Sequence, residues 1–523
     1  MATIIAAAPE PRADLKVWLA VIGSIIGAFI AVLNIQITNA SLPDIQGAIG
    51  AGIDDGGWIS TSYLVAEIVV IPLTGFLAPV FSLRRYLLAS TVLFLVMSVA
   101  CAFAGNLQQM IALRALQGFF GGVLIPLAFT ITLTMLPRAQ QPVGMAMFAL
   151  SATFAPAIGP TIGGYLTDTY GWQYIFYVNL VPGAVMLAAL LPSLPRAPMQ
   201  LGLLRHGDWP GIATLAIGLA SLQTVLEEGN KDDWFGSPFV VRLSLVAAVS
   251  LTLFLWIELT TERPLLNLRL LLRRNFGLGS IANVILGMAL YGSVFLLPSY
   301  LSQMQGYNAQ QVGEVLAWTG LPQLALIPFV PRLMRRFDSR LLVAVGLGLF
   351  AASCFLNIDI NRDYSGPQLL LPNLVRALGQ ALVMTPLSVL ATGGIERENA
   401  GSASAMFNMM RNLGGSIGIA ALQTLLTRRE QFHSAVITPN VSLFNQATRQ
   451  RLDAMQQYFM SSGTADPATA WHDAVVGIGR AVRAQAYFLA YGDTFCIMGA
   501  TLLLAIVAAV LMRQSSGGGA GAH

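Results

Sequence analysis

The chain consists mainly of apolar blocks of about 20 residues, which alternate with short polar segments. About 20 consecutive apolar residues form a helix long enough to cross a bilayer, so each block predicts one membrane-spanning helix. Only 10% of the 523 residues are charged, against about 25% in soluble proteins. The sequence therefore predicts an all-α membrane protein. The fourteen blocks are roughly 17–37, 58–79, 86–105, 108–135, 143–166, 174–193, 209–227, 239–259, 276–301, 311–331, 341–358, 368–392, 402–426 and 486–512.

Arginine and lysine gather in every second connection between blocks and near both chain ends. By the positive-inside rule this predicts that both termini lie in the cytoplasm. The long connection 427–485 is an exception because it holds six arginines, but a long loop crosses a membrane largely regardless of charge. Its middle, residues 444–460, has helical spacing. We expect either a solvated outer loop or a surface that docks a partner outside the membrane.

A short motif occurs twice. Arg114-Ala115-Leu116 precedes Pro126 in the fourth block, and Arg376-Ala377-Leu378 precedes Pro386 in the twelfth. Corresponding features in two halves indicate a duplicated six-helix bundle. The offset of eight blocks leaves two helices inserted between the bundles. The predicted units are an N-terminal bundle (1–200), two inserted helices (201–265), five helices of a C-terminal bundle (266–426), an outer loop (427–485), and the last helix with its tail (486–523).

Ionisable residues inside a membrane are costly and are functional candidates by default. Glu67 lies near the middle of the second block, and it either carries protons or is hydrogen-bonded for structure. Arg114 is a buried cation that requires carboxylate or carbonyl partners. Other polar residues in the blocks either line a substrate cavity or join helices to one another: Asn34, Gln36, Thr38, Gln117, Asn283, Tyr291, Arg376, Gln380, Asn408 and Arg411.

The fifth block contains glycines and prolines at helical spacing. Gly159 and Gly163 share one face and allow a neighbouring backbone to come close, while Pro156 and Pro160 each remove a hydrogen bond and favour a kink. This segment is either ordinary helix packing, which is common in membrane helices, or a place where two packed bodies move against each other.

Metal and cofactor chemistry has little support. The three cysteines and four histidines are scattered and show no metal-ligand spacing. The blocks contain no Ser-His pair suited to nucleophilic catalysis. We therefore expect no cofactor, no metal and no enzymatic activity, and the net charge of +4 does not indicate a nucleic-acid partner, because the basic residues lie mainly at helix ends.

Several strings resemble motifs of the fourteen-helix drug:proton antiporters of the major facilitator superfamily, most closely the EmrB-type multidrug exporters. Residues 34–43 resemble the first-helix motif, and residues 75–85 the loop between helices two and three. Residues 114–118 resemble the helix-four motif, and Gly159-Pro160 with Gly163-Gly164 resembles the helix-five motif. Residues 402–418 resemble the thirteenth helix, so the resemblance covers essentially the whole chain.

The resemblance implies a major facilitator fold with fourteen membrane helices, two six-helix bundles and two inserted helices. It implies proton coupling through Arg114, a cytoplasmic loop gate with Gly75, Arg84 and Arg85, and a flexible bundle interface at residues 159–164. It also implies location in the bacterial inner membrane. The partners it implies are an EmrA-like periplasmic adaptor and a TolC-like outer-membrane channel.

The sequence departs from the family pattern at important positions. Asn34 replaces an Asp of helix one, and Asn cannot titrate, whereas Glu67 stands where an amide is usual. We hypothesise that the proton-binding carboxylate has moved from helix one to helix two, which we expect to pack together. Pro79 and Ser82 replace the usual Asp and Gly of the loop motif, so the gate is held differently.

The function expected is proton-coupled efflux of amphiphilic drugs or toxic small molecules by alternating access. The alternative is a dedicated exporter of one metabolite, siderophore or fatty acid, without proton coupling if Asn34 marks an uncoupled carrier. A membrane enzyme and a non-transporting scaffold are weaker alternatives, since a scaffold has no use for ionisable residues in both bundles.

Overall fold

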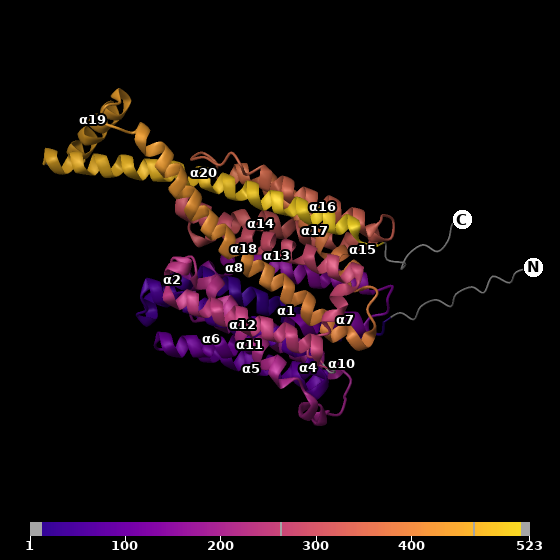
Figure 1. Ribbon diagram of the computed structural model, residues 1–523. Helices are drawn as coiled ribbons and strands as arrows, with labels where there is room; N and C mark the ends of the chain where they lie inside the picture. The colour runs from indigo at the N-terminus through magenta and orange to yellow at the C-terminus, as the bar shows by residue number, and fades with distance from the viewer. Residues whose placement is uncertain (1–12, 262–263, 464–465, 514–523) are drawn as a thin grey trace, which may run out of the picture.

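The computed structural model describes residues 13–261, 264–463 and 466–513, and this part of the chain is helical, without strands. Figure 1 shows the helices running side by side, with the start of α1 and the end of α20 at one end of the molecule, here called the terminal face. The opposite end is called the distal face. The first-half helices are α1 (Leu15–Ala40), α2 (Leu42–Ile49), α3 (Ile53–Gly56), α4 (Trp58–Phe81), α5 (Leu83–Cys101), α6 (Leu107–Gly121), α7 (Leu124–Met135), α8 (Gln141–Tyr170), α9 (Tyr174–Tyr177) and α10 (Leu180–Ser193).

The second half forms its own group of helices, and the two groups lie beside each other in Figure 1. Two helices, α11 (Trp209–Glu228) and α12 (Pro238–Thr260), connect the groups in sequence and pack on each other. The second-half helices are α13 (Arg274–Gln305), α14 (Ala309–Leu326), α15 (Val330–Met334), α16 (Ser339–Phe355), α17 (Gly366–Thr392), α18 (Ala400–Ile437), α19 (Gln446–Ser461) and α20 (Pro467–Leu511).

Every predicted apolar block is helical. Among the described residues, twelve helical segments are long and apolar enough to cross a membrane, which confirms the predicted helical membrane protein. The eleventh block, α16, has 17 residues, and the thirteenth, α18, has 38 residues and is less apolar. The total of fourteen spans stays a prediction.

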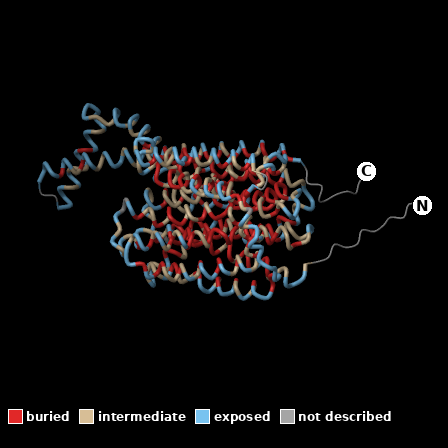
Figure 2. Tube along the Cα trace, turned by 60° about the horizontal axis from the view of Figure 1, so that its bottom comes forward, coloured by how far each residue is buried: buried red, intermediate tan, exposed pale blue. Residues whose placement is uncertain are grey.

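The predicted outer loop 427–485 is largely helical in the structure. α18 continues to Ile437 and α20 already begins at Pro467, so both helices project beyond the bundles at the distal face, with α19 between them. Figure 2 shows this projecting segment as mostly exposed, in contrast to the buried interior of the bundles. The polar residues of the segment can form helices outside the bundles because their side chains there remain in water.

The bundles meet along several pairs of helices. α8 packs against α14 and α17, and α18 packs against α4 and α7. Within the first bundle, α1 packs mainly against α8, whereas α4 packs against α6, and α1 and α4 have few contacts. The two spans still touch, since Ser60 of α4 donates to Asn39 of α1 over 2.6 Å and the Tyr63 hydroxyl donates to the Ala31 carbonyl over 3.4 Å. The expectation that they pack together is met only in part, because α8 and α6 take most of the positions next to them.

The inserted helix α11 contacts both bundles at the distal face. Thr61 of α4 donates a hydrogen bond to Glu228 over 2.9 Å. The Trp234 indole, which follows α11, donates to the Thr424 hydroxyl of α18 over 3.0 Å. The insertion is thus attached to the seam between α4 and α18.

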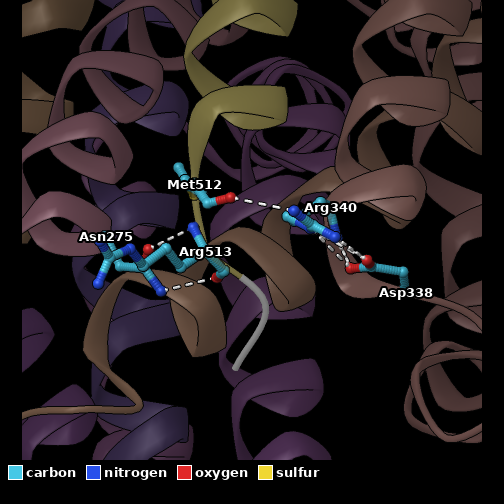
Figure 3. Close-up of polar contacts among 5 residues, drawn as sticks. All are labelled: Asn275, Asp338, Arg340, Met512 and Arg513. Atoms are coloured by element: carbon cyan, nitrogen blue, oxygen red, sulfur yellow. Dashed lines mark hydrogen bonds and ion pairs between the residues drawn. The ribbon is translucent and has the colours of Figure 1, made fainter. Parts of the chain in front are cut away.

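The terminal face is held by polar contacts at the end of α20. Figure 3 shows Arg340 paired with Asp338 at 2.6 Å, and its guanidinium also donates to the Met512 carbonyl over 3.3 Å. Asn275 donates to the Arg513 carbonyl over 2.9 Å and accepts from the Arg513 amide over 2.7 Å. The last carbonyls of a helix have no partner within the helix, so Arg340 satisfies the carbonyl of the capping residue Met512. Asn275 holds the next residue, Arg513, in place.

Candidate functional site

The two bundles are in close contact in the half of the molecule next to the terminal face. The Ser404 hydroxyl of α18 donates to the Pro126 carbonyl of α7 over 2.7 Å. The rings of Phe129 and Phe407 lie 5.7 Å apart across the same boundary. A Cβ atom on Gly75 would lie 3.4 Å from the backbone of Gly401. The passage between the bundles is therefore closed on this side.

The other half of the boundary contains a cavity of about 680 Å³, here called the large cavity. Its walls come from both bundles and from α11. Four predicted site residues line it: Gln36, Glu67, Pro160 and Tyr291. Further lining residues lie toward the distal face, including Asn39, Ser60, Gln223, Glu227, Gln423 and Tyr307. The cavity therefore lies on the distal side of the closed region.

A second, narrow pocket of about 30 Å³ lies deeper between the bundles. It shares Tyr291 and Val294 with the large cavity, so the two are adjacent. Arg376, Gln380 and Arg411 contribute its polar wall. We call it the arginine pocket.

Glu67 is a buried carboxylate at the wall of the large cavity. The residue is 3% exposed, and its Oε1 has no hydrogen-bond partner in the described part of the chain. A buried carboxylate without a partner pays a high desolvation cost when ionised. The sequence left open whether Glu67 carries protons or is hydrogen-bonded for structure. The structure gives no support to a structural hydrogen bond at Oε1.

Arg114 is fully enclosed in the first bundle, where it is 1% exposed. Its Nη1 donates to Asn34 Oδ1 and to Gln117 Oε1, both over 2.6 Å, and its Nε donates to the Ile59 carbonyl over 3.2 Å. The guanidinium also lies over the Tyr63 ring, 4.3 Å from its centroid. Amide oxygens, a carbonyl and a ring face thus take the place of the carboxylate that such a cation often uses.

Several residues predicted for the cavity line neither cavity and are instead hydrogen-bonded inside their bundle. Asn34 and Gln117 hold Arg114, and Thr38 donates to the Asn34 carbonyl over 2.8 Å. In the second bundle, Asn283 donates to the Phe407 carbonyl over 2.7 Å. Asn408 donates to the Ser404 carbonyl and accepts from Arg411, both over 2.9 Å. Asn34, Gln117 and Asn283 thus join two helices, as one alternative of the sequence analysis has it. The bonds of Thr38 and Asn408 stay within their own helices.

The glycine motif of α8 faces its own bundle. A Cβ atom on Gly159 would lie 2.5 Å from Gln36 Cβ, and one on Gly163 would lie 2.9 Å from the Ile37 carbonyl oxygen, both on α1. Gly164 is buried in the same helix. At the bundle boundary, a glycine of α14 makes the close approach, since a Cβ atom on Gly320 would lie 2.6 Å from Ala157 Cβ.

The predicted loop gate divides into two groups. Gly75 lies at the contact between bundles described above. Arg84 instead donates to the carbonyls of Leu194 and Leu191, over 2.8 and 2.6 Å, and so attaches α5 to the end of α10 within one bundle. Arg85 is exposed.

The sequence analysis missed the contribution of the inserted helix α11 to the large cavity. Gln223 and Glu227 are four residues apart, share a helix face, and are hydrogen-bonded to each other over 2.9 Å. Glu228 also lines the cavity. The spacing of Gln223 and Glu227 was visible in the sequence, but their position near a helix end suggested contact with water at the interface.

Comparison with known proteins identifies the family. The sequence matches the Major Facilitator Superfamily over residues 24–419. The chain belongs to this superfamily. It is 31% identical to the multidrug export protein EmrB of Escherichia coli K12 and 30% identical to the colistin resistance protein EmrB of Acinetobacter baumannii. Each alignment covers 95% of this chain and 96% of the relative.

These relatives place the chain with the EmrB-type members of the superfamily, as the sequence motifs indicate. A solved structure of the proton:xylose symporter XylE aligns with 96% of this chain and 97% of its own, with a TM-score of 0.60 at 14% identity. This likeness supports the fold alone. The chain is thus a multi-pass membrane protein of a transporter superfamily.

Proposed function

We propose that this protein exports amphiphilic drugs or toxic small molecules across the bacterial inner membrane in exchange for protons. The observation that carries the proposal is the large cavity between two bundles, closed toward the terminal face and walled in part by the unpartnered carboxylate of Glu67. The multidrug export name of the Escherichia coli relative supports the substrate class. A mostly apolar cavity with a few polar groups suits amphiphilic compounds.

The positions of the cavity and the closed region fit alternating access. With both termini in the cytoplasm, as the distribution of arginine and lysine predicts, the cavity lies on the periplasmic side. This arrangement corresponds to the state that releases substrate outside. Rocking of one bundle against the other along the α4–α18 and α8–α14 boundaries would open the opposite side.

Glu67 is proposed to bind the proton that is exchanged for the exported compound. It faces the large cavity, and no described residue satisfies its Oε1. Arg114 is proposed as a positioning residue for this coupling, since it lies on α6, which packs against α4. The carboxylate function would thus reside on the second span, which contacts the first span only through a few residues.

The test is dye efflux from proteoliposomes under an imposed proton gradient. A panel of amphiphilic dyes of different charge is used, and wild type is compared with Glu67→Gln and with Glu398→Gln, which removes an exposed carboxylate at the terminal face. We expect gradient-driven efflux to fall to its gradient-free level in Glu67→Gln alone, because the amide cannot take up a proton.

The outcomes separate the parts of the proposal. Equal efflux in wild type and Glu67→Gln would remove Glu67 from the proton path and leave Asp168, Glu314 and the second bundle as places to search. If the efflux rate of the wild type does not depend on the proton gradient, the protein is an uncoupled facilitator. No efflux of any dye would contradict export of broad amphiphiles and favour the dedicated exporter of one metabolite, siderophore or fatty acid.

A partner outside the membrane is a further part of the proposal. The projecting ends of α18 and α20 with α19 extend away from the bundles at the distal face. Phe444, at 96% exposure, and Tyr458, at 65%, are large side chains on this segment. We propose that it docks an EmrA-like adaptor, which leads to a TolC-like channel in the outer membrane. Loss of co-purification of an adaptor when residues 438–466 are replaced by a short linker would support this.

A further inference from the structure

The arginine pocket has a composition that the general export function does not explain. Both of its arginines are buried, Arg376 at 6% exposure and Arg411 at 3%. Its other lining residues are apolar or uncharged, including Ala157, Leu290 and Leu316. No Asp or Glu lines it. Two positive charges therefore face one small space without a negative charge in its walls.

Arg376 uses few of its hydrogen-bond donors. A guanidinium has five N–H groups, and the structure shows one hydrogen bond, from Nη2 to the Thr319 hydroxyl over 2.6 Å. Its Nε is buried and has no partner among the described residues. A buried donor without a partner costs about 1–3 kcal/mol, so this arrangement is favoured only if something else satisfies it.

Arg411 is in a similar position on the facing helix α18. Its Nη2 donates to Asn408 Oδ1 over 2.9 Å, and its guanidinium lies 5.6 Å from the centroid of the Phe148 ring. In the described part of the chain, no ion pair joins Arg376 or Arg411 to a carboxylate. Glu67, in the wall of the adjacent large cavity, interacts electrostatically with Arg411 but forms no ion pair with it. In the described part of the chain, neither arginine therefore has a carboxylate in direct contact.

We propose that the arginine pocket binds the anionic head group of the exported compound, a carboxylate or a similarly small monoanion, while its apolar part lies in the large cavity. The pocket of about 30 Å³ admits only a small group, and the adjacent cavity of about 680 Å³ has room for the remainder. Guanidinium groups bind carboxylates with strong, directed hydrogen bonds. This inference rests on the proposed function, because it names the substrate class of the same cavity.

The alternative is that the two arginines only join helices. Arg114 shows what a joining arginine looks like here, since three acceptors and an aromatic ring surround it. Arg376 has one acceptor and an unpaired Nε at a cavity wall. Arg376 therefore has fewer of its N–H donors hydrogen-bonded than Arg114, and this difference favours a ligand at Arg376.

The experiment measures binding to purified protein in lipid nanodiscs, without a proton gradient. The probes are dodecanoate, dodecanol and dodecyltrimethylammonium, and the variants are Arg376→Gln, Arg411→Gln and Arg376→Lys, with the exposed Arg336→Gln as the control. Partition into lipid is the same for every variant, so the ratio of variant to wild-type affinity reports the protein alone. We expect each Gln variant to weaken dodecanoate binding about tenfold or more, to leave dodecanol unchanged, and to weaken dodecanoate less in Arg376→Lys.

A second measurement uses only the wild type, so it tests the proposal even if the variants do not fold. Bound dodecanoate is displaced by benzoate or by benzyl alcohol, two soluble compounds of similar size that differ in charge. We expect benzoate to displace it at a concentration about tenfold lower.

The results separate this inference from the proposed function. Equal displacement by benzoate and benzyl alcohol would overturn the anion site. Gln variants that weaken the binding of all three dodecyl probes to the same extent would overturn it too. Neither result contradicts export of amphiphiles. Failure of the wild type to bind any of the probes would overturn both. Efflux that stays independent of the gradient, with carboxylate binding intact, would contradict only proton coupling.

Discussion

Arg114 and Arg376 occupy corresponding places in the two bundles, each followed by Ala and Leu and then by a proline in the same helical region. Their surroundings differ. Arg114 donates to Asn34, Gln117 and a carbonyl inside one bundle. Arg376 has one hydrogen bond and faces a pocket between the bundles. The comparison teaches that a repeated buried arginine has its partners supplied within one bundle in the first half, and keeps unpaired donors beside a pocket in the second.

The surrounding polar residues explain the difference. Asn34 and Gln117 place amide oxygens against Arg114 from α1 and from its own helix. Near Arg376, the amide of Gln380 accepts instead from Gln323 over 2.8 Å, so its oxygen is already used. An arginine whose neighbours are paired with one another keeps its donors for other partners.

The largest expected effect is on stability. Arg114→Met should lower the free energy of unfolding by about 3 kcal/mol, because three acceptors lose a charged donor in a buried site. Arg376→Met should change it by less than about 1 kcal/mol, because removing a poorly satisfied charge offsets the lost bond to Thr319. Denaturant unfolding of both variants in one detergent measures the contrast. Equal losses would show that both arginines are structural.

A smaller effect is expected from two glycines with matched geometry. Gly159→Ala places a methyl group against Gln36 within one bundle, and Gly320→Ala places one against Ala157 between bundles. Overpacking inside a bundle has no easy relief, so Gly159→Ala should cost about 1–3 kcal/mol. In Gly320→Ala, separation of α8 from α14 relieves the clash, so stability should change less while the transport rate changes.

Thermal unfolding measures the stability of both glycine variants, and dye efflux measures their transport rates. If Gly320→Ala unfolds as easily as Gly159→Ala and transports at the wild-type rate, the α8–α14 boundary does not move in the cycle. The same measurements on Gly47→Ala, a site where a Cβ atom meets nothing within 4 Å, provide the control.

The smallest effect is expected on the pH dependence of stability at the terminal face. There an arginine of the second half, Arg273, is paired with a carboxylate, whereas an arginine of the first half, Arg84, is bound to backbone carbonyls. Arg273 donates to Glu396 over 2.9 Å, which contributes most to lowering the pKa of Glu396 from 4.5 to about 2. A lowered pKa stabilises the fold above about pH 4.5, and this contribution is lost as the pH falls toward 2. Both side chains are about half exposed, so the effect is small.

Arg84, by contrast, binds backbone carbonyls, and neither partner titrates in this range. The difference in thermal midpoint between wild type and Glu396→Gln should therefore shrink from pH 6 to pH 3. The difference for Arg84→Gln should stay constant. A constant difference for Glu396→Gln would show that its ion pair contributes nothing in solution.

The sequence alone determined the membrane-spanning helices, because transfer of apolar residues into a bilayer depends on their number and run length. Its motifs also indicated the family, and its repeated arginine motif indicated the correspondence between Arg114 and Arg376. These features are local, so they can be recognised without knowing which helices touch.

Only the tertiary structure decided which helices lie together and hence what each polar residue does. It made α8, more than α4, the neighbour of α1, turned Gly159 toward its own bundle, and brought Glu227 of α11 into the cavity wall. A helix shows several faces to several neighbours, and in a membrane most of them are similarly apolar, so hydrophobic pattern alone does not specify its partners. The role of Arg376 depends on contacts across two bundles, which only the assembled fold determines.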